Sequence, residues 1–113
     1  MKKVNVGLIG FGTVGTGVVR ALLERKSLLA KRSGIELILR RVCDKDLSRR
    51  RAISIDRSIL TNEIKDILND KEIDIVIELI GGIHPAKEII IEALKKGKHI
   101  VTANKALLAE AGL

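Results

Sequence analysis

Short apolar segments alternate along this chain with longer stretches in which apolar residues recur every three or four positions. Segments rich in β-branched residues, which favour strands, are residues 4–9, 35–43, 73–80 and 98–103. Helical spacing is found in residues 13–31, 63–69 and 85–96. Strands that alternate with helices indicate a parallel sheet with helices on both faces. The pattern therefore predicts an α/β fold with a doubly wound parallel sheet.

The segments differ in how fully they should be buried. IDIVIELI, residues 73–80, is almost continuously apolar, as expected for a strand covered on both faces. IELILRRVC, residues 35–43, has mixed polarity and should be less buried. Residues 44–58 predict a polar loop with a short helical turn, and residues 59–60 a short third strand. Gly34 and Gly97 stand where helices end, and Pro85 stands where one begins.

Composition narrows the class of protein. The 113 residues form one domain at most, and no apolar run is long enough to span a bilayer, so we expect a cytoplasmic protein. The net charge of +7 suggests nucleic acid, but the chain has no Tyr or Trp and one Phe for stacking on bases, and its basic residues are scattered. The single cysteine, Cys43, predicts a buried, inert thiol. His84 and His99 lack partners at ligand spacing, so we predict no metal, with His99 half-buried in a strand.

The most informative stretch is GLIGFGTVGTG, in which Gly10, Gly12 and Gly15 have G-x-G-x-x-G spacing between a predicted strand and a predicted helix. Gly10 would permit the tight turn, Gly12 would let a diphosphate approach the backbone, and Gly15 would let the helix pack against the strand. The N–H groups of Thr13, Val14 and Gly15 would then face the phosphates. This context predicts a dinucleotide site in a Rossmann-type fold; the alternative is a glycine-rich turn without a ligand.

An acidic residue after the second strand is the next expected feature of such a site. Asp44 directly follows IELILRRVC, where its carboxylate would bind the ribose hydroxyls of NAD. Lys45 and residues 49–51, all arginine, follow at once and could hold the 2′-phosphate of NADP instead. The cofactor is therefore predicted as NAD or NADP, with a slight preference for NAD.

Two further features fall at the ends of later strands. Gly81 and Gly82 end the IDIVIELI segment, at the sheet edge where open parallel sheets bind ligands. Lys105 follows the last strand at the same edge, where its ammonium could bind an anion or polarise a developing alkoxide. Glu78 is either buried and paired or turned toward the cleft.

These motifs together resemble the amino-terminal cofactor domain of homoserine dehydrogenase. The resemblance runs from about residue 6 to 112 and is most specific in Glu78 followed by Gly81-Gly82, and in the run GKHIVTANKALLA. It implies NAD(P)-dependent interconversion of L-aspartate 4-semialdehyde and L-homoserine, in threonine and methionine biosynthesis. It also implies that Phe11, Gly12, Thr13 and Val14 line the cofactor phosphates and that Lys105 contacts the nicotinamide and the reacting oxygen.

In that family the substrate contacts and most of the homodimer interface lie in a following region. We therefore interpret residues 1–113 as one dinucleotide-binding domain, a fragment with a truncated sheet, which binds cofactor but does not catalyse alone. One alternative is a stand-alone nucleotide-sensing regulatory module, which shares the glycine motif and the acid. Another is a different two-domain oxidoreductase, although the E-K-P triplet typical of the sugar- and imine-reducing relatives is absent.

Overall fold

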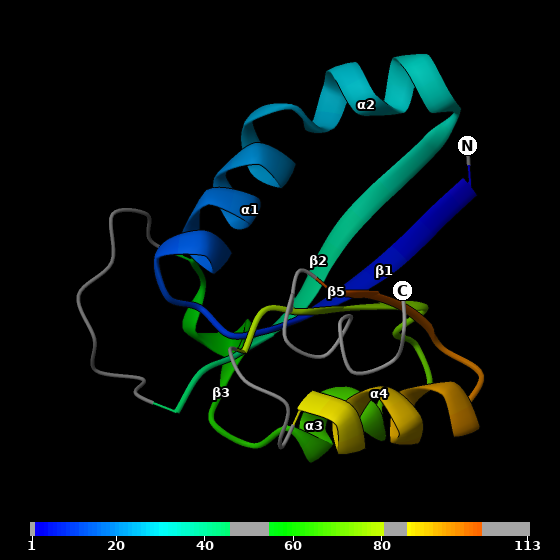
Figure 1. The fold of residues 1–113 in the computed structure, drawn as a ribbon. Coiled ribbons are helices and arrows are strands. Elements are labelled where there is room, and N and C mark those ends of the chain that lie inside the picture. Colours follow the sequence, from blue (N-terminus) through cyan, green and yellow to red (C-terminus); the bar gives the residue numbers. More distant parts are fainter. Residues whose placement is uncertain (1, 46–54, 81–85, 103–113) are drawn as a thin grey trace.

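The fold is a parallel five-stranded sheet, seen in a computed structural model that describes residues 2–45, 55–80 and 86–102 (Figure 1). The strands lie in the order β3-β2-β1-β4-β5, and every pair is parallel. They comprise β1 (Lys2–Ile9), β2 (Ile35–Cys43), β3 (Leu60–Thr61), β4 (Ile75–Glu78) and β5 (His99–Thr102). The α-helices are α1 (Thr13–Glu24), α2 (Lys26–Ser33), α3 (Lys65–Leu68) and α4 (Ala86–Lys95), and η1 (Arg57–Ile59) is a 3-10 turn. The predicted doubly wound α/β fold is confirmed.

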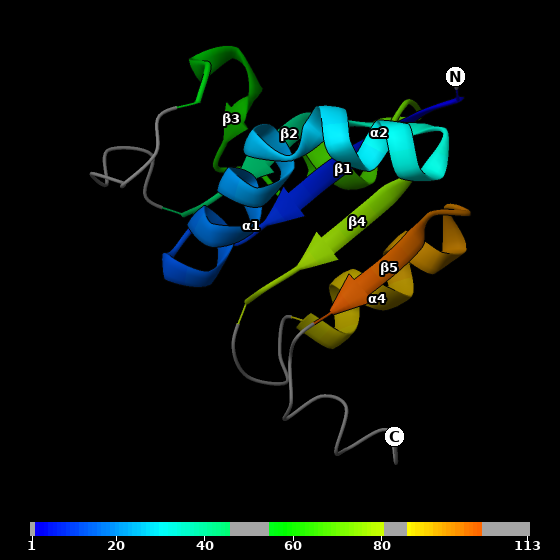
Figure 2. The same ribbon diagram turned by 90° about the horizontal axis from the view of Figure 1, so that it is seen from above.

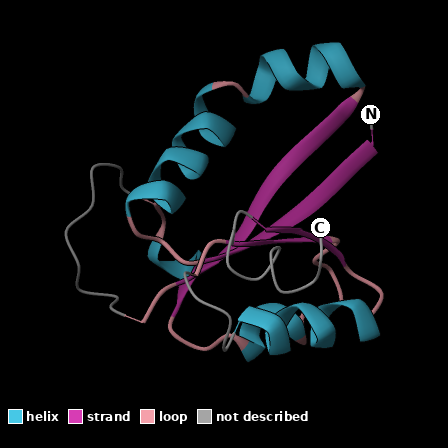
Figure 3. Ribbon diagram, in the orientation of Figure 1, coloured by secondary structure: helices cyan, strands magenta, loops and turns pink. Residues whose placement is uncertain are grey.

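Helices cover both faces of this sheet. Figures 1 and 3 show α1 and α2 on one face and α3 and α4 on the other. On the α1 face a buried cluster joins Leu8, Phe11, Val19 and Val42. On the other face a second cluster contains Ile9, Cys43, Ile67, Leu68, Ile73, Val76, Ile89 and Ala93. Leu8 and Ile9 thus serve opposite faces of β1, as the period of two in a strand requires.

The strand order reverses between β1 and β4. From β1 the chain proceeds outward to β2 and β3, and it then returns to the other side of β1 to form β4 and β5 (Figure 2). At the carboxyl edge the two central strands stay joined, because the Leu79 N–H donates to the Ile9 carbonyl at 2.9 Å. In open α/β sheets the crevice at such a reversal is where ligands bind.

One predicted helix is in fact two. Residues 13–31 predicted a continuous helix, but the chain turns at Arg25, whose φ of −107° and ψ of 13° end α1. The apolar stripe of α1 does not continue into α2, where Leu28 is exposed, so the two helices bury different surfaces. Gly34 then ends α2 with a φ of 71°, as predicted, and its N–H donates to the Ala30 carbonyl.

Other predictions hold with shifted boundaries. β4 is shorter than residues 73–80, and β2 is less buried than the central strands until its last two residues. Gly97, with a φ of 75°, follows α4. The prediction that His99 is half-buried was wrong: it is exposed, since β5 has a described neighbour only in β4. Pro85, His84 and the helix expected after residue 103 lie outside the described residues.

Candidate functional site

The junction between β1 and α1 brings backbone segments unusually close. Gly10 has a φ of +105°, a conformation that side chains rarely adopt, and its N–H donates to the Cys43 carbonyl at 2.8 Å. A Cβ built on Gly15 would lie 2.0 Å from the Gly10 carbonyl oxygen. The helix therefore rests directly on the turn that leaves the strand, and the roles predicted for Gly10 and Gly15 fit this geometry.

The start of α1 has no side-chain cap. Gly12 is its N-cap residue, no side chain caps the helix, and no acidic residue stands in its first turn. Thr16 donates both its backbone N–H and its hydroxyl to the Gly12 carbonyl, at 2.8 and 2.7 Å. A helix amino terminus carries about half a positive charge, so this end favours an anion.

A cavity of about 590 Å³ lies beside this junction, at the carboxyl edge of the sheet. Its volume is within the range of about 300–1,000 Å³ that small-molecule sites occupy. The loop between β1 and α1 borders it on one side, and the segments after β2 and β3 border it on the other. It is lined by Ile9, Gly10, Phe11, Gly12, Cys43, Asp44, Lys45, Asn62, Glu63, Ile64, Lys65 and Ile80.

Carboxylates shape the electrostatics of this cavity. Burial raises the pKa of the Cys43 thiol to about 11, and the nearby charges of Asp44, Asp66 and Glu63 add to that effect. Asp44 and Glu63 line the cavity together with the ammonium groups of Lys45 and Lys65. The cavity thus offers both acceptors for hydroxyl groups and cations for phosphate. The prediction that Cys43 is buried is confirmed, and its raised pKa is consistent with an inert thiol.

Glu78 is buried and paired. Its side chain has no exposed surface; Oε1 accepts from the Ile80 N–H at 2.6 Å and Oε2 accepts from the Thr102 hydroxyl at 2.7 Å. These bonds tie the ends of β4 and β5 together and fix the chain that leads to residue 81. Of the two readings left open by the sequence, the structure supports the buried one.

The cavity brings together part of the predicted site. Gly10, Phe11, Gly12 and Asp44 line it, although the Phe11 side chain is 1% exposed and belongs to the core, so Phe11 contributes chiefly its backbone. Gly15 does not line the cavity but packs against the turn that contains Gly10. Thr13 and Val14 are the first residues of α1, but their side chains are outside the part of the chain that the structure describes. Gly81 and Lys105 lie wholly outside it.

Sequence reasoning missed the segment after β3. Asn62, Glu63 and Lys65 line the cavity because β3 ends at Thr61, at the same edge as β1 and β2. The signal was present: once residues 59–60 are taken as a strand, the next polar residues must fall at the ligand-binding edge.

Two further observations concern the described residues alone. No helix among them has the length and apolar character needed to cross a membrane. They also contain no group of three or more His, Cys, Asp or Glu side chains that could hold a metal ion.

Comparison with known proteins identifies the family. Residues 10–113 match a family model described as the NAD-binding domain of homoserine dehydrogenase. The homoserine dehydrogenase of Bacillus subtilis is 40% identical over 112 residues, which is 99% of this chain and 26% of that protein. That of Corynebacterium glutamicum is 42% identical over 106 residues, 94% of this chain and 24% of its own length.

Solved structures agree with the sequences. The homoserine dehydrogenase of Thiobacillus denitrificans superposes with a TM-score of 0.89 at 42% identity, covering 99% of this chain and 26% of that one. A levoglucosan dehydrogenase in complex with NADH, at 21% identity and a TM-score of 0.70, covers 89% of this chain and 27% of that one, and it shares the fold. The chain spans about a quarter of the length of the relatives it matches. It belongs to the family of homoserine dehydrogenase NAD-binding domains, as its motifs suggested.

Proposed function

We propose that the carboxyl-edge cavity binds NAD(P) and that this chain is the cofactor domain of an enzyme that interconverts L-aspartate 4-semialdehyde and L-homoserine. The observation that carries the proposal is the close contact between Gly15 and the Gly10 carbonyl, which only a glycine at position 15 permits. This contact holds the turn between β1 and α1 beside a cavity of suitable size. A bound nicotinamide dinucleotide supplies hydride transfer, and the protein supplies binding and orientation.

The residues divide this task by position. The backbone at Gly10, Phe11 and Gly12 would receive the diphosphate, with the uncapped start of α1 facing its charge. Asp44 would accept hydrogen bonds from the adenosine ribose, which favours NAD, whereas Lys45 would favour the 2′-phosphate of NADP. Gly81, at the carboxyl end of a predicted strand, would let the backbone lie beside a ribose or the nicotinamide. Lys105 would contact the cofactor and the reacting oxygen, as the family resemblance implies.

The resemblance to that family implies that substrate contacts and a homodimer interface belong to a following region. We therefore propose that this chain binds cofactor without turning over substrate, since one lysine cannot both position a carbonyl and supply its proton. NADH mixed with L-aspartate 4-semialdehyde and this chain alone should be consumed no faster than in buffer. Turnover would contradict this division of roles. The cytoplasmic location remains a prediction from the sequence.

Titration with NADH, followed by its fluorescence, tests the binding site. Gly12→Val should weaken binding at least about tenfold, because the added side chain occupies the approach of the diphosphate. Gly17→Val is the matched control: it adds the same side chain to α1 at a position where a Cβ meets nothing within 4 Å, and it should bind NADH normally. Parallel titration with NADPH gives the preference, and Asp44→Asn should shift it toward NADPH. Absence of binding at millimolar concentrations of either coenzyme would overturn the site.

A further inference from the structure

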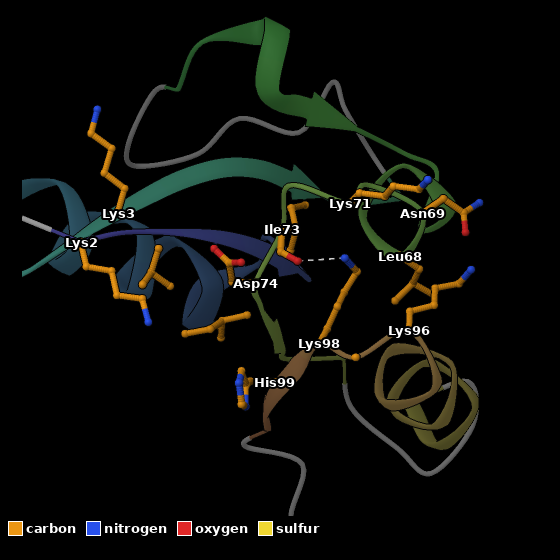
Figure 4. A pocket seen from close by; sticks show the side chains of 13 residues that line it. Lys2, Lys3, Leu68, Asn69, Lys71, Ile73, Asp74, Lys96, Lys98 and His99 are labelled. Carbon is orange, nitrogen blue, oxygen red and sulfur yellow. Dashed lines mark hydrogen bonds between the residues drawn. The ribbon is translucent and has the colours of Figure 1, made fainter.

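A second and larger cavity lies at the opposite, amino edge of the sheet. It has a volume of about 760 Å³ and is formed where β1, β4 and β5 begin, with the turns after α3 and α4 closing it (Figure 4). Its floor is apolar, with Val4, Leu68, Ile73 and Ile75. The cofactor proposed above would bind at the other edge, so this cavity has no part in that function.

Cations dominate the lining of this cavity. Its lining contains five lysines and one carboxylate, that of Asp74. Figure 4 shows Lys2 and Lys3 on one side of Asp74 and Lys71 and Lys96 on the other. Within the described ranges Lys2, Lys3 and Lys71 have no ion-pair partner, whereas Lys96 lies 3.6 Å from Glu92. The carboxylate of Asp74 accepts a hydrogen bond from the Asn5 N–H at 2.9 Å, so part of its hydrogen-bonding capacity is already used by the backbone.

Lys98 is the unusual member of this group. It is 7% exposed, and its ammonium donates to the carbonyls of Asp70 at 2.6 Å and Ile73 at 2.9 Å. An ammonium has three N–H groups, and the described part of the chain supplies acceptors for two of them and no carboxylate. A buried charge is normally paired with an opposite one. The two carbonyls hold this cation in place without neutralising it.

We propose that this amino-edge cavity binds a small multivalent anion of the phosphate class. Several ammonium groups around one cavity create a positive potential that attracts a multiply charged anion, and lysine binds phosphate as a compact point charge. The cavity is of small-molecule size, and its described lining includes the imidazole of His99 but no Phe, Tyr or Trp side chain on which a nucleobase could stack. The inference is independent of NAD(P) binding.

Inorganic pyrophosphate is the probe, and backbone amide resonances of the isotopically labelled chain are the readout. Pyrophosphate should shift the amides of residues 97–99 in a saturable way, and the shifts should persist when NADH is already bound. The double variant Lys2→Ala and Lys71→Ala, which removes one exposed cation from each side, should weaken this binding about three- to tenfold. The matched control, Lys31→Ala with Arg32→Ala, removes the same charge from exposed positions at the end of α2 and should leave the affinity within about twofold.

Four results would overturn the proposal. They are no saturable shift at residues 97–99, shifts confined to residues 10–12, equal weakening by both double variants, and equally tight binding of citrate. The third would reveal only the general positive field of the chain, and the last would remove the preference for phosphate. Because residues 10–12 and 97–99 report on different edges, failure here is distinguishable from failure of the cofactor site.

Discussion

Adding one methyl group at Gly15 tests the central geometric feature of this domain. In Gly15→Ala the new Cβ would lie 2.0 Å from the Gly10 carbonyl oxygen, whereas real Cβ contacts essentially never fall below 3.0 Å. The gap between α1 and the turn must therefore widen by at least about 1 Å. A flexible side chain could swing away, but the obstacle is backbone that is itself held by the hydrogen bond from the Gly10 N–H to the Cys43 carbonyl.

The size of the effect follows from the buried residue that α1 contributes to the core. Displacing α1 moves Val19, which is fully buried against Leu8 and Phe11, and overpacking of this kind costs about 1–3 kcal/mol. Replacing glycine by alanine in a helix otherwise gains up to ~1 kcal/mol. We expect a net loss in the free energy of unfolding of up to about 2 kcal/mol, which corresponds to up to roughly 10 °C in melting temperature for a domain of this size.

Urea and thermal unfolding, followed by far-ultraviolet circular dichroism, measure this loss. Gly17→Ala is the matched control, since it makes the same change in the same helix at a position where the added Cβ meets nothing within 4 Å. It should be neutral or stabilising. The glycine-to-alanine gain is common to both variants, so they should differ by the overpacking cost of about 1–3 kcal/mol. A Gly15→Ala variant as stable as Gly17→Ala would refute the close contact, and with it the geometric argument for the cofactor site.

Three further predictions concern titratable or buried polar groups. Burial raises the pKa of Asp70, but the hydrogen bonds from Arg40 and from the Glu72 N–H, together with the charges of Arg40 and Arg41, outweigh it, so the pKa lies below 3.8 in the folded chain. The stabilisation from this group is present above that pH and is lost as the pH falls through the folded pKa. The urea midpoint should therefore decline more steeply in acid for the wild type than for Asp70→Asn, and equal slopes would contradict the ion pair. Because the pKa of Cys43 is raised to about 11, iodoacetamide at neutral pH should label it slowly until urea unfolds the chain. Thr102→Val should cost about 1–3 kcal/mol in thermal unfolding by removing a donor to the buried Glu78, while Thr102→Ser should retain most of the stability.

The parts of the fold that depend on local chemistry could be predicted from the sequence. Gly10, Gly34 and Gly97 all have positive φ and stand at turns, where glycine avoids the steric penalty of a side chain. The β-branched, apolar runs form strands because that composition suits a sheet covered on both faces. The glycine spacing predicted the contact between α1 and β1 because only the absence of a Cβ at Gly15 allows it.

Features that depend on which segments become neighbours could not be read from the sequence. Glu78 is buried because Thr102 lies beside it, 24 residues later in the chain, and either reading was compatible with the local sequence. The turn at Arg25 reflects a change in the surface that each helix buries, and the run of helix-forming residues gives no sign of it. Glu63 reaches the cavity only because the two-residue strand β3 pairs with β2.

Parallel topology explains why each edge of this sheet brings together polar and charged residues from distant segments of the chain. Residues that follow strands meet at the carboxyl edge, which unites Gly10, Asp44 and Asn62 in one cavity. Residues that precede or open strands meet at the amino edge, which unites Lys2, Lys71 and Lys98 in another. Along the sequence these lysines look like scattered, solvated charges, and the net charge of +7 gives no hint that five lysines line one cavity. The strand order that justifies a dinucleotide site at one edge is therefore also the reason to test for an anion at the other.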